Sequence, residues 1–539
     1  MMLVLIMNFI RMKKTNHVYD IELISELCKA QPEGEFNSTD VARKYCKKLG
    51  IEYKVSRART VQVIVKKHQF HIDLINPKMS TQFVAAEKRK YKGKSKNVMV
   101  AWAQAKTPID DNLWDNMLVY AEEHDAEILV IPGTYLNTNS PYSTQVRREF
   151  AWDEKISDYM YATESNIHKH LIMIADTDVL PTGKRPLNNF HSITGLESCI
   201  IGHPRQHMQV VPTMKNSRRK FMFTTGSITV PNYRKARAGK ESKVHHKMGF
   251  LFIENLDSEN FTARHVHAEK DGSFEDLHYR ISDGTVVKVK KPWEAMIFGD
   301  THLSKEDQGL LDESRRLIDE VGCKQTVWHD LMDGYSINHH QMKDHVEQVI
   351  KANKGLNVLE DELEMSISFI NEWKDTNMVI VPSNHPDWLD KWVRFNHNAK
   401  HAINSVLFNK FQSVLYEEKA PKGLYAYVIN KEFGREVNCL HRDDSHMVCG
   451  IELNNHGDLG SNGAKGTPLT FAKLNTQIVS GDKHHSYTLD NAYGVGLSAV
   501  LDHNYNKGMS SWTQSNGIIL SNGRFQHLLY FNGKFTNLI

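Results

Sequence analysis

Ala295-Met-Ile-Phe-Gly-Asp300-Thr-His302 is a hydrophobic run that ends in two residue types able to bind metal ions. Four later segments repeat this order of a hydrophobic run followed by a polar cluster: residues 326–333, 378–385, 447–456 and 477–484. Each run suits a strand buried in a layered sheet, and each cluster falls where the strand leaves the sheet. Because active sites of layered α/β folds lie at the carboxyl ends of strands, the pattern predicts an α/β fold with its site at one sheet edge.

The polar residues in these segments are of the types that hold two divalent metal ions. Such a pair neutralises a phosphodiester, generates hydroxide at neutral pH and stabilises the leaving oxygen. A carboxylate has two oxygens, so Asp330 is the natural bridge between the ions. The other candidates are imidazoles and an amide that suit borderline metals: His302, His456, His484 and Asn384. Chance clustering is the alternative in a chain with 29 histidines, and five ordered segments argue against it.

In this order the segments resemble the motifs of calcineurin-like metallophosphoesterases, which are Asp-x-His, Gly-Asp-x-x-Asp, Gly-Asn-His-Asp/Glu, an isolated His and Gly-His-x-His. The resemblance covers about residues 293–539. It implies a first metal held by Asp300, His302, Asp330 and His484. It implies a second metal held by Asp330, Asn384, His456 and Asp482. It also implies that His385 is the catalytic histidine, and Asp333 is a further catalytic candidate.

The chain departs from these motifs at four positions. His329 and Ser383 stand where the motifs have glycine, which mainly affects the local backbone. Pro386 replaces an acidic residue, so we expect the next residue, Asp387, to orient His385. Asp482 replaces a histidine, which makes the site harder and favours manganese, or magnesium, over zinc.

The rest of the chain divides into two further regions. Residues 1–90 are predicted to be helical, residues 91–290 to form a second α/β domain, and residues 291–539 to form the catalytic layered β-sandwich flanked by helices. In the first region, a basic amphipathic helix from Ser38 breaks at Gly50, and Val55 starts a second helix. A helix-turn-helix fits this outline, and an ordinary helical hairpin is the favoured interpretation.

Two interpretations of the second region also remain. Strand-like runs at residues 97–102 and 127–133 flank a predicted helix at residues 111–124. The layout fits a degenerate copy of the catalytic fold that lacks the full ligand set, and it fits an unrelated α/β domain nearly as well.

A basic segment runs from Lys215 to Lys247, with ten Lys or Arg residues, one acid and three interleaved aromatic residues. Basic residues pair with phosphates and aromatic rings stack on bases, so this composition favours a nucleic-acid contact over a solvated hairpin. The candidate contacts are Lys215, Arg218, Arg219, Lys220, Tyr233, Arg234, Lys235 and Arg237.

Composition limits the remaining possibilities. The 539 residues carry a net charge of +3, so any affinity for polyanions must come from local patches. Six cysteines without paired metal-ligand spacing indicate reduced, buried thiols of a cytoplasmic protein. The apolar residues 1–10 are too few to span a membrane, and no membrane association is expected.

A two-metal site together with basic segments predicts a DNA nuclease. The segment Asp330-Leu-Met-Asp-Gly-Tyr resembles the SbcD-like nuclease branch of the superfamily. The whole chain is also similar to phage nucleases that degrade host DNA, which implies action in the cytoplasm of an infected bacterium. The nuclease branch implies a homo-oligomer. Two alternatives remain: a nucleotide phosphatase or cyclic-nucleotide phosphodiesterase, and a non-catalytic DNA-binding protein that modulates the host.

Overall fold

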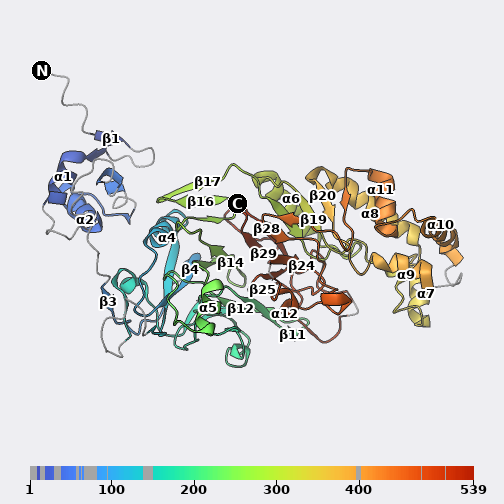
Figure 1. The fold of residues 1–539 in the computed structure, drawn as a ribbon, viewed down its shortest axis with the longest axis horizontal. Coiled ribbons are helices and arrows are strands. Elements are labelled where there is room, and N and C mark those ends of the chain that lie inside the picture. The colour runs from blue at the N-terminus through green and yellow to red at the C-terminus, as the bar shows by residue number, and fades with distance from the viewer. Residues whose placement is uncertain are drawn as a thin grey trace, which may run out of the picture.

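The computed structural model describes residues 9–11, 18–29, 38–55, 60–61, 63–65, 82–93, 95–137, 150–395, 402–474, 476–503 and 506–539. It is a mixed α/β structure with several sheets, which confirms the predicted class. Figure 1 shows a small helical part at one end, the sheets in the centre and a group of helices at the other end. Among the described residues, no helix has the length and apolar character needed to cross a membrane.

The N-terminal part is a small helical unit with its own hydrophobic cluster. α1 (Ile21–Lys29) and α2 (Ser38–Leu49) pack together through buried side chains such as Ile24 and Tyr45. α2 confirms the helix predicted from Ser38. It ends at Leu49 and is followed by Gly50, whose φ of 64° glycine adopts without steric cost. The second predicted helix lies partly outside the described residues, so the helix-turn-helix interpretation stays a prediction.

The middle region, which is the second region predicted at residues 91–290, is built around a four-stranded sheet in the order β14-β13-β4-β5. The predicted strand-helix-strand unit is present, because β4 and β5 pair in parallel and α4 lies between them in the sequence. The Asp110 side chain caps α4 by accepting a hydrogen bond from the Leu113 amide. The elements are β4 (Asn97–Gln104), α4 (Asp111–Glu123), β5 (Ala126–Gly133), β13 (Gly249–Asn255) and β14 (Phe261–His267).

The C-terminal region contains a six-stranded sheet in the order β21-β20-β19-β18-β28-β29. β18, β19 and β20 are parallel neighbours, so the segments that follow them leave the sheet at the same edge. α6 (Gln308–Val321) separates β18 from β19 in sequence and is capped by Asp307. The strands are β18 (Ala295–Phe298), β19 (Thr326–Trp328), β20 (Met378–Ile380), β21 (Asn438–Cys439), β28 (Ser515–Ile519) and β29 (Phe525–Leu529).

A ten-stranded sheet joins the middle and C-terminal regions, in the order β22-β23-β24-β26-β25-β10-β12-β9-β8-β7. Five strands come from each region, and they meet where β10 pairs antiparallel with β25. The boundary predicted between residues 290 and 291 therefore does not separate two sheets. From the middle region come β7 (Ser165–His168), β8 (Leu171–Ile174), β9 (Ser198–Ile201), β10 (Met208–Val211) and β12 (Lys220–Thr224). From the C-terminal region come β22 (Met447–Val448), β23 (Ile451–Glu452), β24 (Gln477–Ser480), β25 (Tyr487–Leu489) and β26 (Ala492–Gly494).

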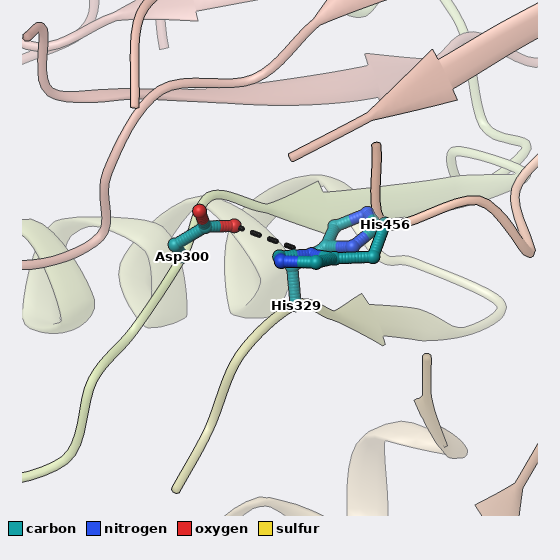
Figure 2. Close-up of side chains that lie close together, drawn as sticks. All are labelled: Asp300, His329 and His456. Carbon is teal, nitrogen blue, oxygen red and sulfur yellow. Dashed lines mark ion pairs between the residues drawn. The ribbon is translucent and has the colours of Figure 1, made fainter. Parts of the chain in front are cut away.

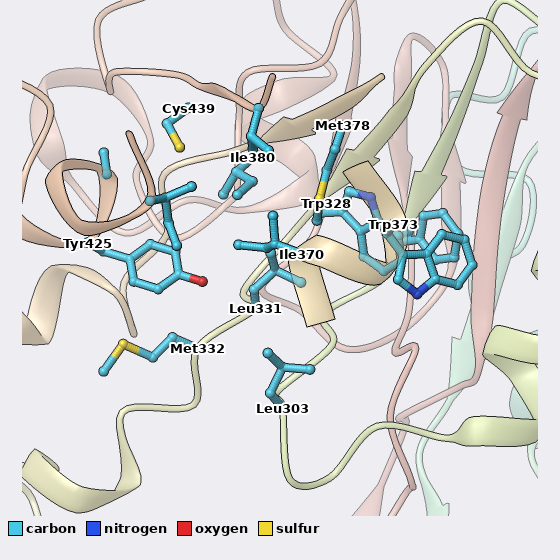
Figure 3. Packing of buried hydrophobic residues seen from close by; sticks show 14 of the residues in the cluster. Leu303, Trp328, Leu331, Met332, Ile370, Trp373, Met378, Ile380, Tyr425 and Cys439 are labelled. Atoms are coloured by element: carbon cyan, nitrogen blue, oxygen red, sulfur yellow. The ribbon is translucent and has the colours of Figure 1, made fainter. Parts of the chain in front are cut away.

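Hydrophobic clusters lie on both faces of the six-stranded sheet. On one face, Ile297 and Val327 pack with Ile451 and Val479 of the ten-stranded sheet. On the other face, Trp328 and Trp373 are part of a cluster that includes residues of the surrounding helices (Figure 3). Burial of each such side chain stabilises the fold by about 1.5–3 kcal/mol, which holds the strand ends rigidly. The helices are α7 (His345–Asn353), α8 (Leu359–Trp373), α9 (Asp387–Phe395), α10 (Ser405–Tyr416) and α11 (Leu424–Phe433).

All six cysteines are free, and four of them are buried, as predicted. Cys449 is an exception because it is exposed in the turn between β22 and β23, with a φ of 51°. Its place in an apolar stretch of sequence wrongly indicated burial, since the chain reverses direction there.

Candidate metal centre

The five predicted segments meet at one place, where two sheets present the ends of their strands. Asp300, Asp330 and Asn384 follow the parallel strands β18, β19 and β20 of the six-stranded sheet. His456 follows β23 of the ten-stranded sheet, and the segment with Asp482 and His484 follows its neighbour β24. Seven ligand candidates converge there: Asp300, His302, Asp330, Asn384, His456, Asp482 and His484.

Asp330 lies at the centre of this group. Its Oδ2 atom is 3.6 Å from His456 Nε2, 3.8 Å from His302 Nε2 and 4.0 Å from His385 Nε2. A carboxylate oxygen surrounded by three imidazole nitrogens is suited to a position between cations, and the bridging role of Asp330 stays a prediction.

The remaining candidates lie on two sides of Asp330. On one side, His484 Nε2 is 3.0 Å from Asp300 Oδ2 and 3.2 Å from His302 Nε2. On the other side, His456 Nε2 is 2.8 Å from Asn384 Oδ1 and 3.9 Å from Asp482 Oδ1. The two sides adjoin each other, because Asp300 Oδ1 is also 3.8 Å from His456 Nδ1.

Several buried polar atoms in this group have no hydrogen-bond partner of good geometry among the residues that the structure describes. They include both carboxylate oxygens of Asp300, one oxygen of Asp330 and the Nδ1 atom of His456. A buried polar atom without a partner is costly, and most native proteins avoid it. Divalent cations would satisfy these atoms, so the residues present fit such ions.

His329 is a residue that the sequence did not assign to the site. Figure 2 shows it beside Asp300 and His456, and ligand atoms of these three residues lie within 4.8 Å of one another. Both ring nitrogens of His329 are buried, and no described residue forms a hydrogen bond with them. Its position directly before Asp330 could have indicated a ligand. In the sequence, His329 was instead treated only as a residue in place of a motif glycine.

Burial controls the protonation of the site. It lowers the pKa of His329 to about 3 and, with the help of neighbouring His302, that of His484 to about 3. Both imidazoles are therefore neutral near pH 7, which is the form that binds metals. Burial and the adjacent Asp330 raise the pKa of Asp300 well above its ordinary value. A cation bound in the cluster would therefore stabilise the ionised form of Asp300.

The backbone at the ligand positions is also unusual. His302, Asp330, Asp482 and His484 all have left-handed φ angles, between 45° and 61°. Such angles cost energy in residues other than glycine and concentrate at functional sites. Gly481 allows the close approach of two loops, because a Cβ atom there would lie 2.2 Å from Asp300 Oδ1.

His385 is held in place at the edge of the group. Its Nδ1 donates a hydrogen bond of 2.6 Å to the carbonyl oxygen of Asp333, and its ring stacks on Trp388 with 4.1 Å between centroids. Burial opposes the charged form of this imidazole, but Asp330 and Asp333 raise its pKa to about 9. His385 therefore carries a proton at neutral pH.

Asp333 contacts two of the histidines. Its Oδ1 atom is 3.1 Å from His302 Nδ1 and 3.4 Å from His385 Nδ1. Burial opposes its ionisation, but these hydrogen bonds hold the pKa of Asp333 below its usual range. The expectation that Asp387 orients His385 was wrong, because Asp387 instead pairs with Arg442 at 2.8 Å and Asp333 takes the orienting position.

The predicted nucleic-acid contacts lie in different environments. Lys220 is buried and donates hydrogen bonds to the carbonyl oxygens of His191 and Gly195, so its ammonium faces the protein interior. Tyr233 is hydrogen-bonded to His246. The other predicted contacts have partly or fully exposed side chains: Lys215, Arg218, Arg219, Arg234, Lys235 and Arg237.

The chain is similar to Protein A1 of Escherichia phage T5. The two sequences are 28% identical over 468 residues, which cover 82% of this chain and 83% of that protein. This similarity supports a phage protein of the T5 type. No family model matches the chain, and no solved structure matches it significantly.

Proposed function

We propose that this protein is a two-metal phosphodiesterase that cleaves DNA in the cytoplasm of a phage-infected bacterium. The position of Asp330 Oδ2, within 4.0 Å of three histidine nitrogens, is the observation that carries the proposal. The unpartnered oxygens of Asp300 add to it, and the similarity to a phage T5 protein supports the setting.

Each metal has a set of residues suited to hold it. Asp300, His302, Asp330 and His484 would hold the first, and Asp330, Asn384, His456 and Asp482 the second. His329 is close enough to Asp300 and His456 to take part. Manganese suits this mixture of carboxylates and imidazoles, and magnesium is the second choice. When bound, the ions neutralise the phosphodiester and lower the pKa of water, so that hydroxide is present at neutral pH.

The residues around the metals position the substrate and move a proton. His385 stands at the edge of the cluster with its Nε2 4.0 Å from Asp330 Oδ2, where this nitrogen can donate a proton to the departing 3′ oxygen. The Asp333 carbonyl oxygen accepts the Nδ1 proton, which aims Nε2 at the Asp330 side of the site. His385→Ala should therefore retain metal binding and lose cleavage. Full cleavage by this variant would remove His385 from the mechanism.

The test uses supercoiled plasmid, EDTA, and manganese, magnesium or zinc added in excess of the chelator. We expect manganese to restore cutting by the wild type and not by Asp330→Asn, because the variant lacks the central carboxylate charge. Asp443→Asn is the matched control, since the Asp443 side chain is 93% exposed. Turnover of an aryl phosphate ester with intact plasmid would favour a small-ester phosphatase. Plasmid binding without any metal-dependent turnover would favour a non-catalytic DNA-binding protein.

A further inference from the structure

The middle and C-terminal regions have the same strand plan. β18, β19 and the hairpin β28–β29 give the order β29-β28-β18-β19, and β4, β5 and the hairpin β13–β14 give β14-β13-β4-β5. Within the ten-stranded sheet, β22-β23-β24-β26-β25 has its counterpart in β7-β8-β9-β12-β10. The two sets meet at the antiparallel pairing of Met208 with Thr488. The sheet therefore consists of two similar halves joined edge to edge.

Individual backbone hydrogen bonds repeat as well. Asp300 N donates to Gly496 O and Asp300 O accepts from Ser498 N, while Trp102 N donates to Gly226 O and Trp102 O accepts from Ile228 N. The next bonds also correspond, because Asp307 N donates to Ser498 O and Asp110 N to Ile228 O. Both of these aspartates cap the helix that follows. Trp102 thus takes the place in the middle region that Asp300 has in the metal centre.

The indole of Trp102 fills the space that corresponds to the metal centre. Trp102 is 2% exposed, and a Cβ atom at Gly133 or Gly202 would lie within 3 Å of its ring. Gly202 follows β9 as Gly481 follows β24, and Gly481 approaches Asp300 in the same way. The middle region is therefore a copy in which an apolar side chain replaces the first metal ligand.

Each half extends a turn into the other. Asp490, between β25 and β26, lies 2.8 Å from Arg205 Nη1 and 3.1 Å from His207 Nε2 of the middle region. The corresponding turn, between β10 and β12, carries the basic residues Lys215, Arg218 and Arg219. Its short strand β11 (Thr213–Met214) pairs with β27 (Met509–Ser510) of the C-terminal region.

The basic turn reaches the loops that carry the metal ligands. Arg219 Nε donates a hydrogen bond of 2.8 Å to the carbonyl oxygen of Trp512. The Trp512 ring packs edge-on against His484, with 4.4 Å between centroids. The next residue, Thr513, donates its amide to His484 O at 2.9 Å. Trp512 therefore connects Arg219 of the basic turn to His484, a metal-ligand candidate.

A groove of about 640 Å³ lies between the basic turn and the C-terminal loops. Lys215, Arg218 and Arg219 line it on one side, and Thr513 and Asp502 are among the residues of the other side. Lys215 pairs with Asp502, and Arg218 Nη2 is 3.7 Å from Glu259. Both basic side chains are partly exposed, so a polyanion can compete with these carboxylates for them.

We propose that this groove binds the phosphodiester backbone of a nucleic-acid strand beside the metal centre, with Lys215 and Arg218 supplied by the inactive copy. The proposal rests on the proposed function, since it places the substrate of that same centre. It also gives a role to the middle copy, in which Trp102 stands at the position that corresponds to Asp300. Arg219 has a different task, because its guanidinium is engaged by carbonyl oxygens and supports the Trp512 loop.

The test compares Lys215→Ala/Arg218→Ala with Lys431→Ala/Arg435→Ala, a matched pair of exposed basic residues at α11. Binding of a fluorescent single-stranded oligonucleotide is measured by anisotropy in EDTA over a salt series. We expect the groove variant to bind about tenfold more weakly, with a salt slope lower by about 1–2, and the control to bind like the wild type. Thermal unfolding checks that both variants are folded. Arg218→Gln replaces the groove variant if the double substitution prevents folding.

A second measurement separates the groove from the chemistry. With manganese, the groove variant should cut plasmid more slowly and hydrolyse a bis-aryl phosphate at the wild-type rate. The proposed binding groove is refuted if the groove variant binds the oligonucleotide like the wild type, or if the control variant loses as much affinity as the groove variant. If the wild type hydrolyses neither plasmid nor ester, the proposed function fails. Binding in EDTA still decides the groove in that case, because it does not require turnover.

Discussion

Replacement of Asp300 should affect the metal-free and the metal-loaded protein differently. Within the described part of the chain, neither buried carboxylate oxygen of Asp300 makes a hydrogen bond of good geometry, although His484 Nε2 is 3.0 Å from Oδ2, and burial and Asp330 raise the pKa of Asp300. Asp300→Asn keeps the shape of the side chain and removes its charge. In EDTA the variant should therefore be at least as stable as the wild type, although the side chain is completely buried.

The magnitude of the metal effect follows from binding linkage. A cation present at 100 times its Kd stabilises the folded state by about 2.7 kcal/mol when it does not bind the unfolded chain. Because one sheet joins the middle and C-terminal regions, they form a unit of about 450 residues, for which this corresponds to an increase in Tm of about 3 °C. Asp300→Asn removes a ligand that carries charge, so its Tm should rise by less than about 1 °C under the same conditions.

The assay is thermal unfolding of wild type and variant, each in EDTA and in excess manganese. Asp443→Asn is the control, and its Tm should rise as much as that of the wild type. The reasoning would be refuted by a variant that is clearly less stable than the wild type in EDTA and yet shows the full increase in manganese. That result would assign Asp300 to the packing of the sheet edge.

Three further predictions concern other residues. Asp482→His should shift the metal that best supports turnover from manganese toward zinc, because imidazole is a softer ligand; an unchanged order of metals would contradict this. Asp490→Asn should lower the free energy of unfolding by about 3 kcal/mol at pH 7, since the buried guanidinium of Arg205, 2.8 Å from Asp490 Oδ1, loses its counter-charge. Burial opposes ionisation of Asp490, but His207 and Arg205 hold its pKa below the usual range. The stabilisation by Asp490 is therefore complete above about pH 4 and is lost as the pH falls further. Denaturant unfolding should show a smaller difference between variant and wild type at pH 3 than at pH 7. Arg264→Ala should cost about 3–5 kcal/mol in the same measurement, because Glu254 and Asp276 are both 0% exposed and would lose their cation; a loss below about 1 kcal/mol would show that the carboxylates find other partners.

Much of the fold could be predicted because strands and caps are local in sequence. The hydrophobic runs before Asp300, Asp330 and Asn384 are the strands β18, β19 and β20, and the helix predicted at residues 111–124 is α4. A run of apolar residues next to a cluster of polar ones marks a strand end without knowledge of its neighbours. The convergence of the ligand candidates then follows from parallel strands that end at one edge.

Other features of the site depend on neighbours that the sequence does not identify. The partner of His385 was expected to be the nearby Asp387 and is Asp333, because α9 turns Asp387 toward Arg442. Lys220 counts as a basic residue in the sequence, but the inward face of β12 buries its side chain. A strand alternates its side chains between two faces, and only the assembled sheet decides which face meets the core.

The sequence by itself determined the class of the fold, the places along the chain of the strands before the ligand candidates, and the residue types of the candidate metal centre, since each rests on patterns within a few residues. Only the tertiary structure decided that two halves share one sheet, that Trp102 stands where the other half has Asp300, and that a basic turn of one half lies beside the ligand loops of the other. These features join residues such as Arg205 and Asp490, which are 285 positions apart. Contacts over such separations depend on how whole sheets pack, and local preferences of the chain do not encode them one by one.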